Sequence, residues 1–308
     1  MCDTLIPGIV VNQEMCTRCG ACVALCTGRV FERTDGRVEA VAPEACWLCG
    51  HCVAACPADA INHSAYPIDE CPPLDPAMLP SLDGLVAGFR ERRSLRVFRD
   101  QPVPRQVVRE LVNLARWGPS ASNEQPVDWL AFDDPAHIAA LSAQAVAVLA
   151  QTARLLRNPL LRPFLRLALG AEKVSRGLES AAGFERLAQR HAQGEDPIFF
   201  RAPVVLIAHV PDDDYFGRDD AVYAAYNLML AAQRMGLGTC QIGYFTVALD
   251  RSRGLRRALG LPEDRRAEIT LMLGHPQYRF RRVLPRRQPD LVWNVGRVSI
   301  PAGVANAR

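Results

Sequence analysis

The 308-residue sequence lacks a long apolar run, an export signal and a strong excess of one charge. Its longest uncharged stretch, residues 135–153, includes histidine, serine, threonine and glutamine, which indicates a helix of a soluble domain rather than a bilayer span. The first residues do not show a basic segment followed by an apolar one, so we expect a cytoplasmic protein. The net charge of +3 does not indicate a nucleic-acid partner.

Lysine is almost absent, and the charges are divided unevenly along the chain. Lys173 is the single lysine, so arginine carries nearly all the positive charge. Residues 1–80 hold four arginines and ten acidic residues, whereas the remainder holds 32 basic and 23 acidic residues. An acidic head followed by a basic body predicts two domains of different chemistry, and the length fits that division.

Eight of the eleven cysteines form one spacing pattern twice, 30 residues apart. Spacing this regular indicates metal ligands rather than disulfides. Three cysteines two residues apart can place three sulfurs on the corners of one iron–sulfur cube, and the fourth sulfur must come from elsewhere in the chain. The pattern C-x-x-C-x-x-C-x-x-x-C comprises Cys16, Cys19, Cys22 and Cys26, and then Cys46, Cys49, Cys52 and Cys56.

Residues 8–64 therefore resemble a bacterial ferredoxin with two 4Fe–4S clusters. Thr27 stands where that family has a proline. The alternative is a Cys₄ zinc site, but zinc ribbons usually combine two separated pairs of cysteines. The resemblance implies that each cluster takes one ligand from the other repeat: Cys16, Cys19, Cys22 and Cys56 for the first, and Cys46, Cys49, Cys52 and Cys26 for the second.

One histidine within the second pattern and the three cysteines outside both patterns give weaker evidence for metal binding. His51, between two cysteines of the second pattern, could be a ligand, although a spacer role is favoured. Cys2 and Cys71 lie outside the patterns, and we expect no role for them. The apolar run around Cys240 predicts a buried cysteine in a strand.

A proline-rich stretch, residues 66–83, separates the head, residues 1–65, from the body, residues 84–308. Its prolines exclude a regular helix or an interior strand, which predicts a semi-rigid linker.

The body alternates helical patterns with short apolar runs, which predicts an α+β domain built in layers. We expect strands over residues 128–132, 203–210, 238–245 and 267–273. One helix is predicted from a cap at Asp219 or Asp220 to Met235, with Gly236 as its stop. Another is predicted over residues 104–117, with its apolar face formed by Val107, Val108, Leu111, Leu114 and Ala115.

Three separated segments of the body suit a flavin mononucleotide. Residues 92–98 combine arginines with a serine, which can hold a phosphate. Residues 117–126 offer amides and hydroxyls that match the donor–acceptor edge of the flavin ring. The glycines of residues 236–245 allow a flat ring to approach the backbone. Position 241 is a glutamine, so the last segment does not match a nicotinamide fingerprint.

Together with Leu273-Gly-His-Pro and the pair Arg286 and Arg287, these segments resemble the nitroreductase family over residues 84–295. The resemblance implies a three-layer fold, FMN at the interface of a homodimer, and reduction through flavin N5. It implies phosphate contacts from Arg92, Ser94, Arg96 and the Arg286–Arg287 pair, with Arg93 nearby. Ring and ribityl contacts fall on Pro119, Ser120, Asn123, Gln125, Gln241, Ile242 and Gly243.

The sequence departs from that family at Gly243-Tyr244, where some members have Glu-Gly. This departure does not point to a side-chain proton donor. Tyr244 is the candidate, with a core aromatic as the alternative role for it, and solvent is the alternative source of the proton. Residues 135–197 are the variable region, where apolar residues alternate with arginines. A lid over the flavin is favoured there over a membrane-surface helix.

These features predict an iron–sulfur flavoenzyme that passes electrons from two clusters to FMN and on to a small organic acceptor. Nitroaromatics, quinones and activated double bonds form the acceptor class. A ferredoxin, a flavodoxin or NAD(P)H is the expected donor. The alternatives are an electron carrier without its own substrate and an enzyme that fragments reduced flavin with oxygen.

Overall fold

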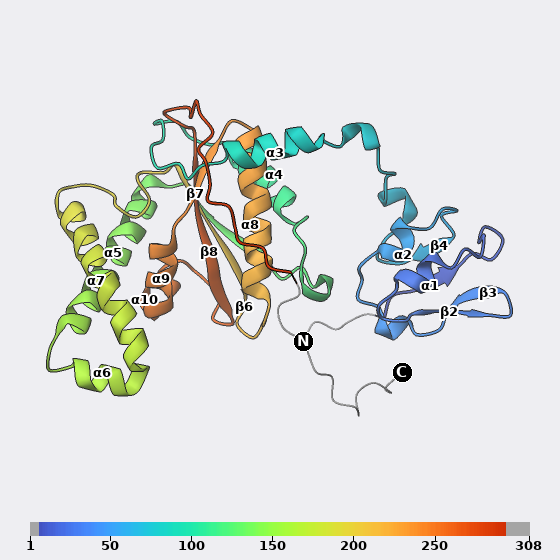
Figure 1. Ribbon diagram of the computed structural model, residues 1–308, viewed down its shortest axis with the longest axis horizontal. Coiled ribbons are helices and arrows are strands. Elements are labelled where there is room, and N and C mark those ends of the chain that lie inside the picture. Colours follow the sequence, from blue (N-terminus) through green and yellow to red (C-terminus); the bar gives the residue numbers. More distant parts are fainter. Residues whose placement is uncertain (1–5, 294–308) are drawn as a thin grey trace.

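The computed structural model describes residues 6–293, which form a small head, a linker and a larger body (Figure 1). Cys2 lies outside the described residues. In the head, β1 (Ile9–Val11) pairs with β4 (Ile61–His63), and β2 (Phe31–Thr34) pairs with β3 (Arg37–Ala40), both antiparallel. Two short helices, α1 (Ala21–Leu25) and α2 (His51–Ala54), and the 3₁₀ turn η1 (Pro43–Ala45) complete it.

The 30-residue repeat of the sequence is also a repeat of the backbone. Gly20 and Gly50 precede α1 and α2 with φ angles of 78° and 71°. Two other pairs related by 30 residues adopt the left-handed region as well: Arg18 with Leu48, and Arg29 with Asp59. Because side chains disfavour this region, its recurrence shows that both repeats make the same turns around their cysteines.

The linker contains only short helical turns before α3. Two 3₁₀ turns, η2 (Ile68–Glu70) and η3 (Pro76–Met78), lie between the prolines, and α3 (Leu82–Glu91) begins after Ser81, whose Oγ accepts from Gly84 N–H. Tyr66 and Cys71 pack on the hydrophobic core of the head. The first residues of the proline-rich stretch thus belong physically to the head.

The body is built on a four-stranded antiparallel sheet with the order β5-β6-β8-β7. The strands β5 (Asp128–Phe132), β6 (Val204–Pro211) and β8 (Arg265–Gly274) agree with the predicted runs. The prediction for residues 238–245 is wrong in its second half. Strand β7 (Gly238–Gln241) is short, and α9 (Gly243–Arg251) begins two residues later.

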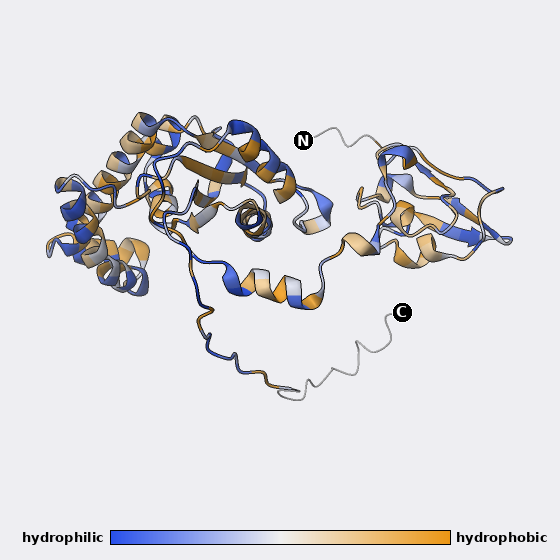
Figure 2. Cartoon of the chain, turned by 90° about the horizontal axis from the view of Figure 1, so that it is seen from above, coloured by the Kyte–Doolittle hydropathy of each residue, from blue (hydrophilic) through white to orange (hydrophobic). Residues whose placement is uncertain are grey.

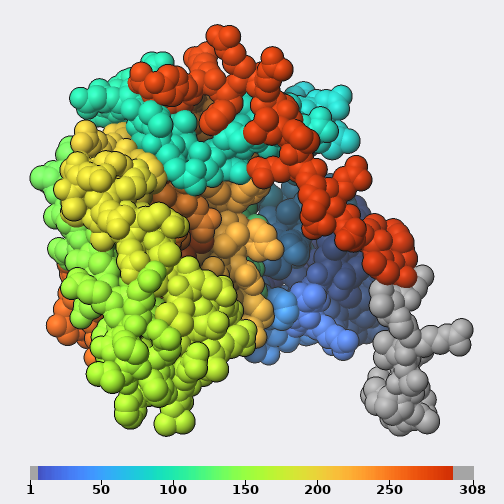
Figure 3. Space-filling view, turned by 60° about the vertical axis from the view of Figure 1, so that its left-hand side comes forward, coloured from blue at the N-terminus to red at the C-terminus, as the bar shows by residue number. Residues whose placement is uncertain are grey.

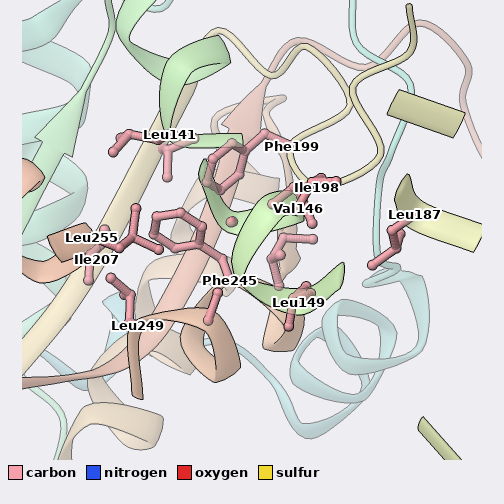
Figure 4. Close-up of a cluster of buried hydrophobic side chains, with 14 of the residues drawn as sticks. Leu141, Val146, Leu149, Leu187, Ile198, Phe199, Ile207, Phe245, Leu249 and Leu255 are labelled. Atoms are coloured by element: carbon pink, nitrogen blue, oxygen red, sulfur yellow. The ribbon is translucent and has the colours of Figure 1, made fainter. Parts of the chain in front are cut away.

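Helices cover both faces of the sheet, which confirms the layered α+β architecture. One face packs against α4 (Arg105–Ala115) and α8 (Gly217–Arg234). The other packs against α5 (Pro135–Arg157), α7 (Ala171–Ala192), α9 and α10 (Arg253–Ala258). The rings of Phe199 and Phe245 contact each other in this core at a tilted angle (Figure 4). Helix α6 (Arg162–Leu169) joins α5 to α7.

Two details of the predicted helices differ. Leu114 is 38% exposed, so it lies at the edge of the buried face of α4 rather than within it. Asp219 and Asp220 lie in the first turn of α8 and do not cap it, because the helix begins at Gly217. Gly236 does follow the helix with a left-handed φ of 76°, as predicted for its stop.

Helix α5 is long and apolar enough to span a membrane by length and composition, and it is the one such helix within residues 6–293. Its Leu141, Ala145 and Leu149 are buried in the core that it shares with α7 and α9. This packing accounts for its composition, since a core helix needs the same apolar residues.

Candidate functional site

The head folds its eight patterned cysteines into two crossed sets. One cavity is bordered by Cys16, Cys19, Cys22 and Cys56. A second is bordered by Cys26, Cys46, Cys49 and Cys52. Each set thus combines three cysteines of one repeat with the fourth of the other, in the grouping that the resemblance implies.

The surroundings of these sulfurs suit thiolate ligands of a metal centre. Backbone N–H groups point at the sulfurs: Val30 donates to Cys26 Sγ at 3.3 Å and Ala60 to Cys56 Sγ at 3.2 Å. Zinc ribbons usually combine two separated pairs of cysteines, whereas three closely spaced cysteines with a fourth from elsewhere are the ligands of a four-iron cluster. The two crossed sets have the second arrangement.

Burial holds several of these sulfurs protonated when no cluster offsets it. It raises the pKa of Cys52 to about 11 and also raises the pKa values of Cys22 and Cys46. Cys19 is exposed, and an N–H of Ala21 lowers its pKa. An iron–sulfur cluster would supply the positive charge that thiolates need in the buried positions.

Two aromatic side chains next to the second set were missed from the sequence. His63 Nε2 lies 3.6 Å from Cys46 Sγ, and burial lowers the pKa of this imidazole. Tyr66 lies against Gly50 and donates its hydroxyl to the carbonyl of Leu48. His51, the histidine singled out from the sequence, is exposed. Only the fold could reveal His63 and Tyr66, because they follow the cysteine pattern by several residues.

In the body, the arginine segment, residues 92–98, pairs with β7 on one side and with the chain after β8 on the other. Ser94 forms a parallel bridge with Thr239, and Phe98 forms an antiparallel bridge with Pro276. This pairing depends on glycine: a Cβ on Gly274 would lie 2.6 Å from the Phe98 ring, and one on Gly238 would overlap Leu95. The structure therefore brings together three of the motifs recognised in the sequence.

A hollow of about 270 Å³ beside this segment has the chemistry of a phosphate site. Arg92, Arg93 and Arg279 border it, together with residues 236–239. The Nη2 of Arg93 is buried without a hydrogen-bond partner in the described part of the chain. A buried, unpaired guanidinium nitrogen is costly unless an anion satisfies it, so these residues fit the phosphate of FMN. Arg279 was missed because the sequence pointed to the later pair.

Ser94 and Arg96 are exposed, and Arg96 borders a second cavity of about 910 Å³. The beginning of α5 and the chain after α7 form its far side. The variable region 135–197 thus borders a cavity that reaches the arginine segment.

Arg286 and Arg287 are not among the residues that border the hollow of about 270 Å³. Arg287 lies 3.9 Å from Asp290 instead. Both arginines belong to the extended C-terminal segment (Figure 2). This segment runs on the outside of the body, beside the cyan residues that follow the linker (Figure 3). The predicted phosphate contact of this pair remains a prediction.

The polar loop of residues 117–126 has a strained backbone. Ser122, Asn123 and Gln125 have φ angles of 49°, 57° and 51°. Such conformations cost about 1–2 kcal/mol each for residues other than glycine, and they persist where the surroundings enforce them.

Contacts with helix α8 hold this loop in place. The Asp220 carboxylate accepts from Ala121 N–H at 3.2 Å, and Gly118 packs against the backbone of Ala224. Within the loop, Ser120 Oγ accepts from Gln125 N–H at 3.0 Å, and Pro119 is exposed. The loop is therefore preorganised for a ligand before one is bound.

This loop and the arginine segment lie far apart within one chain. The loop leads into β5 and residues 92–98 bridge to β7, and these strands are the two edges of the sheet, about 14 Å apart. The loop also contacts the beginning of α8 at Asp220, whereas Glu91 contacts Gln233 near its end. These positions are about 20 Å apart along the helix. Within one chain, the polar loop and the arginine segment therefore lie at opposite edges of the sheet.

The remaining predicted contacts lie where β7 ends and α9 begins. Gln241 is the last strand residue, Ile242 is buried before the helix, and Gly243 is its first residue. This corrects their assignment to a single strand. Tyr244 is 44% exposed, with its ring edge-on to Phe184 of α7 at 6.0 Å. It is thus not a core aromatic, its hydroxyl has no hydrogen bond to a side chain within residues 6–293, and its role remains a prediction.

Asn123 makes a direct contact with the head. Its Nδ2 donates to the carbonyl of Leu48 at 2.6 Å, next to the Tyr66 hydroxyl. Leu48 lies between Cys46 and Cys49, so the second cysteine set adjoins the polar loop.

Comparisons with known proteins agree with this organisation. Residues 89–275 match the model of the nitroreductase family, and residues 8–58 match a 4Fe–4S dicluster domain. A chloronitrobenzene nitroreductase of Comamonas testosteroni is 30% identical over 210 residues, covering 63% of this chain and 86% of the relative. A 4-nitrobenzoate reductase of Nocardioides sp. is 30% identical over 225 residues, covering 69% and 87%.

A similar solved structure is a nitroreductase with bound FMN from Desulfitobacterium hafniense. It is 20% identical, covers 67% of this chain and 93% of its own, and has a TM-score of 0.49. The family match covers more than half of the chain and includes the arginine segment, the polar loop and β7. The chain belongs to the nitroreductase family and carries a 4Fe–4S dicluster domain at its N-terminal end.

Proposed function

We propose that this protein is an iron–sulfur flavoprotein oxidoreductase. In this proposal, two 4Fe–4S clusters in the head supply electrons to FMN in the body, which reduces a small organic acceptor. The observation that carries it is the crossed arrangement of the two cysteine sets in the same chain as Arg93, whose buried Nη2 has no hydrogen-bond partner among the described residues and which borders a hollow of about 270 Å³.

The residues of the chain would share the work as follows. Arg92, Arg93, Ser94 and Arg96 hold the phosphate end, to which Arg279 adds a further positive charge. Side chains of the polar loop and the turn after β7 orient the ring. When bound, FMN accepts electrons singly or in pairs and delivers a hydride equivalent. The cysteines carry the clusters: Cys16, Cys19, Cys22 and Cys56, and Cys26, Cys46, Cys49 and Cys52.

A nitroaromatic compound is the acceptor class that the relatives' names favour. Reduction of a nitro group to a nitroso group consumes two electrons and two protons and releases one water. Quinones and activated double bonds accept two electrons in the same way. The electrons would come one at a time from a reduced ferredoxin or flavodoxin, while NAD(P)H would deliver a hydride to the flavin directly.

A homodimer completes the proposal. The polar loop and the arginine segment contact α8 at positions about 20 Å apart along the helix, so in this proposal a second copy supplies the loop for each flavin site. Ser94 and Arg96 are exposed in the single chain, as expected for residues that a partner covers.

Anaerobic cofactor analysis tests the proposal. We expect about eight iron atoms and one FMN per chain. Zinc in place of iron would overturn it. Arg93→Ala should lose FMN and keep iron, whereas Cys52→Ala should lose about half of the iron and keep FMN. Reduction of FMN by a reduced 4Fe–4S ferredoxin should then fail in Cys52→Ala, and an unchanged rate would contradict the route through the head.

A further inference from the structure

The carbonyl of Leu48 is the point where the head meets the body. It accepts hydrogen bonds from the Asn123 amide of the polar loop and from the Tyr66 hydroxyl. The backbone of Leu48 is left-handed with a φ of 51°, and its N–H lies 3.4 Å from Cys46 Sγ. The same peptide turn thus contacts a cluster ligand on one side and the polar loop on the other.

The equivalent carbonyl of the first repeat faces another way. Arg18 corresponds to Leu48, and its carbonyl accepts from the Arg33 guanidinium at 2.5 Å, within the head and exposed to solvent. The two repeats therefore present the same turn to different partners. The second cysteine set is the one turned toward the body.

The polar loop that receives the head is not near the flavin segment of its own chain. It lies at the β5 edge of the sheet, while the arginine segment lies at the β7 edge. A loop that contributes to a flavin site must therefore contribute to the site of a partner copy. A head bound to that loop then also lies beside the flavin site of the partner copy.

We propose that Asn123 and Tyr66 seat the second cysteine set on the polar loop, so that the head of each protomer serves the flavin site of its partner. This inference rests on the proposed function. Its electron balance is simple: two molecules of reduced ferredoxin are each oxidised by one electron, and one acceptor takes both electrons with two protons. Asn123 and Tyr66 act here as positioning residues, through the carbonyl of Leu48.

Two differently tagged, co-expressed variants distinguish a route within one chain from a route between chains. Cys52→Ala disables the second set and keeps the arginine segment, while Arg93→Ala keeps the head and disables phosphate binding. The purified mixed dimer holds one FMN, anchored by the Cys52→Ala chain. A route between chains supplies this FMN from the intact head of the other chain, so a reduced 4Fe–4S ferredoxin should bleach it in a single turnover. A route within one chain would leave it oxidised and would overturn the inference.

The homodimers separate this outcome from failure of the proposed function. If wild-type FMN is reduced no faster than FMN in the Cys52→Ala homodimer, the proposed function fails. If wild type is faster but the mixed dimer is not, only the inference fails. Iron and FMN contents measured on every dimer show that each retained site is intact.

Small-angle X-ray scattering tests the seating without any turnover. Loss of the Asn123 hydrogen bond should lower the equilibrium constant for seating of the head by about two- to tenfold. The wild-type holoenzyme should therefore be more compact than Asn123→Ala, and Ser122→Ala, an exposed neighbour in the same loop, serves as the matched control. An unchanged radius of gyration in Asn123→Ala would show that this contact does not seat the head.

Discussion

The two cysteine repeats of the head have the same local structure and different surroundings. Both make left-handed turns at positions 30 residues apart, and both direct a backbone N–H at the sulfur of their last cysteine. They differ in what covers the turn: the Arg33 side chain over Arg18, and Tyr66 with Asn123 over Leu48. A repeated motif thus fixes the metal site, while residues outside the motif decide which copy faces the flavin domain.

The largest expected difference comes from removing one ligand in each repeat. Cys22→Ala and Cys52→Ala are equivalent changes, and each should remove about half of the iron. Electron paramagnetic resonance of the one-electron-reduced flavin should show an interaction with the remaining cluster in Cys22→Ala, because the second set adjoins the polar loop. The interaction should be weaker in Cys52→Ala. Equal interactions in the two variants would mean that the repeats are equidistant from the flavin.

The two helix-leading glycines should be equally sensitive to a side chain. Gly20→Ala and Gly50→Ala both force a left-handed alanine and should each destabilise the head by about 1 kcal/mol. The new Cβ at position 20 would also lie 2.6 Å from Arg33 Nη2, whereas at position 50 it would make ordinary contact with Tyr66. Thermal loss of the cluster absorbance measures both. A much larger effect at position 50 would contradict the equivalence of the two turns.

The hydrogen bonds that Tyr66 and Arg33 donate to the two turns should contribute differently to the stability of the head. Tyr66→Phe removes a half-buried donor to Leu48 and should cost about 0.5–1.5 kcal/mol. Arg33→Ala removes an exposed donor to Arg18, where water can replace it, so a smaller change is expected. Hydrogen exchange of the amides around each turn reports the difference. If Arg33→Ala increased exchange around Arg18 more than Tyr66→Phe increased it around Leu48, the expected order of the two hydrogen bonds would be wrong.

The smallest expected effect is a pH dependence of stability that comes from Asp220, the α8 residue that holds the polar loop. Burial raises the pKa of Asp220, whose carboxylate accepts from the polar loop. The folded state therefore binds this proton more tightly than the unfolded state, and the resulting stability is lost as the pH rises through the raised pKa. Asp220→Asn lacks this loss, so the melting temperature of this variant should rise relative to that of wild type as the pH increases above about 4, the ordinary pKa of an aspartate. A constant difference would contradict the burial argument.

Local patterns predicted much of this molecule. The cysteine spacing predicted repeated turns, and the resemblance to two-cluster ferredoxins implied which sulfurs share a cavity. The strands at 128–132 and 203–210 were recognised because short, apolar runs indicate buried strands. The run at 238–245 was overextended, because its apolar residues continue into α9 and periodicity over so few residues does not separate strand from helix.

Non-local contacts could not be predicted in this way. Arg279 and His63 reach their sites through the pairing of distant segments, and each lacks a recognisable motif. The separation of Asn123 from Arg92 depends on the order of strands in the sheet. The contact of Asn123 with Leu48 depends on how two domains meet, and the residues of the two motifs are 75 positions apart.

The bridges of residues 94–98 have a consequence for the chain ends of the body. Arg99 N–H donates to the His275 carbonyl, and Gln277 N–H donates to the Val97 carbonyl, so the entry and the exit of this domain are joined in one seam. A circular permutation that linked them would therefore need only a short connection. The same seam means that tension on the linker or on the C-terminal segment would be transmitted directly to the arginines beside it.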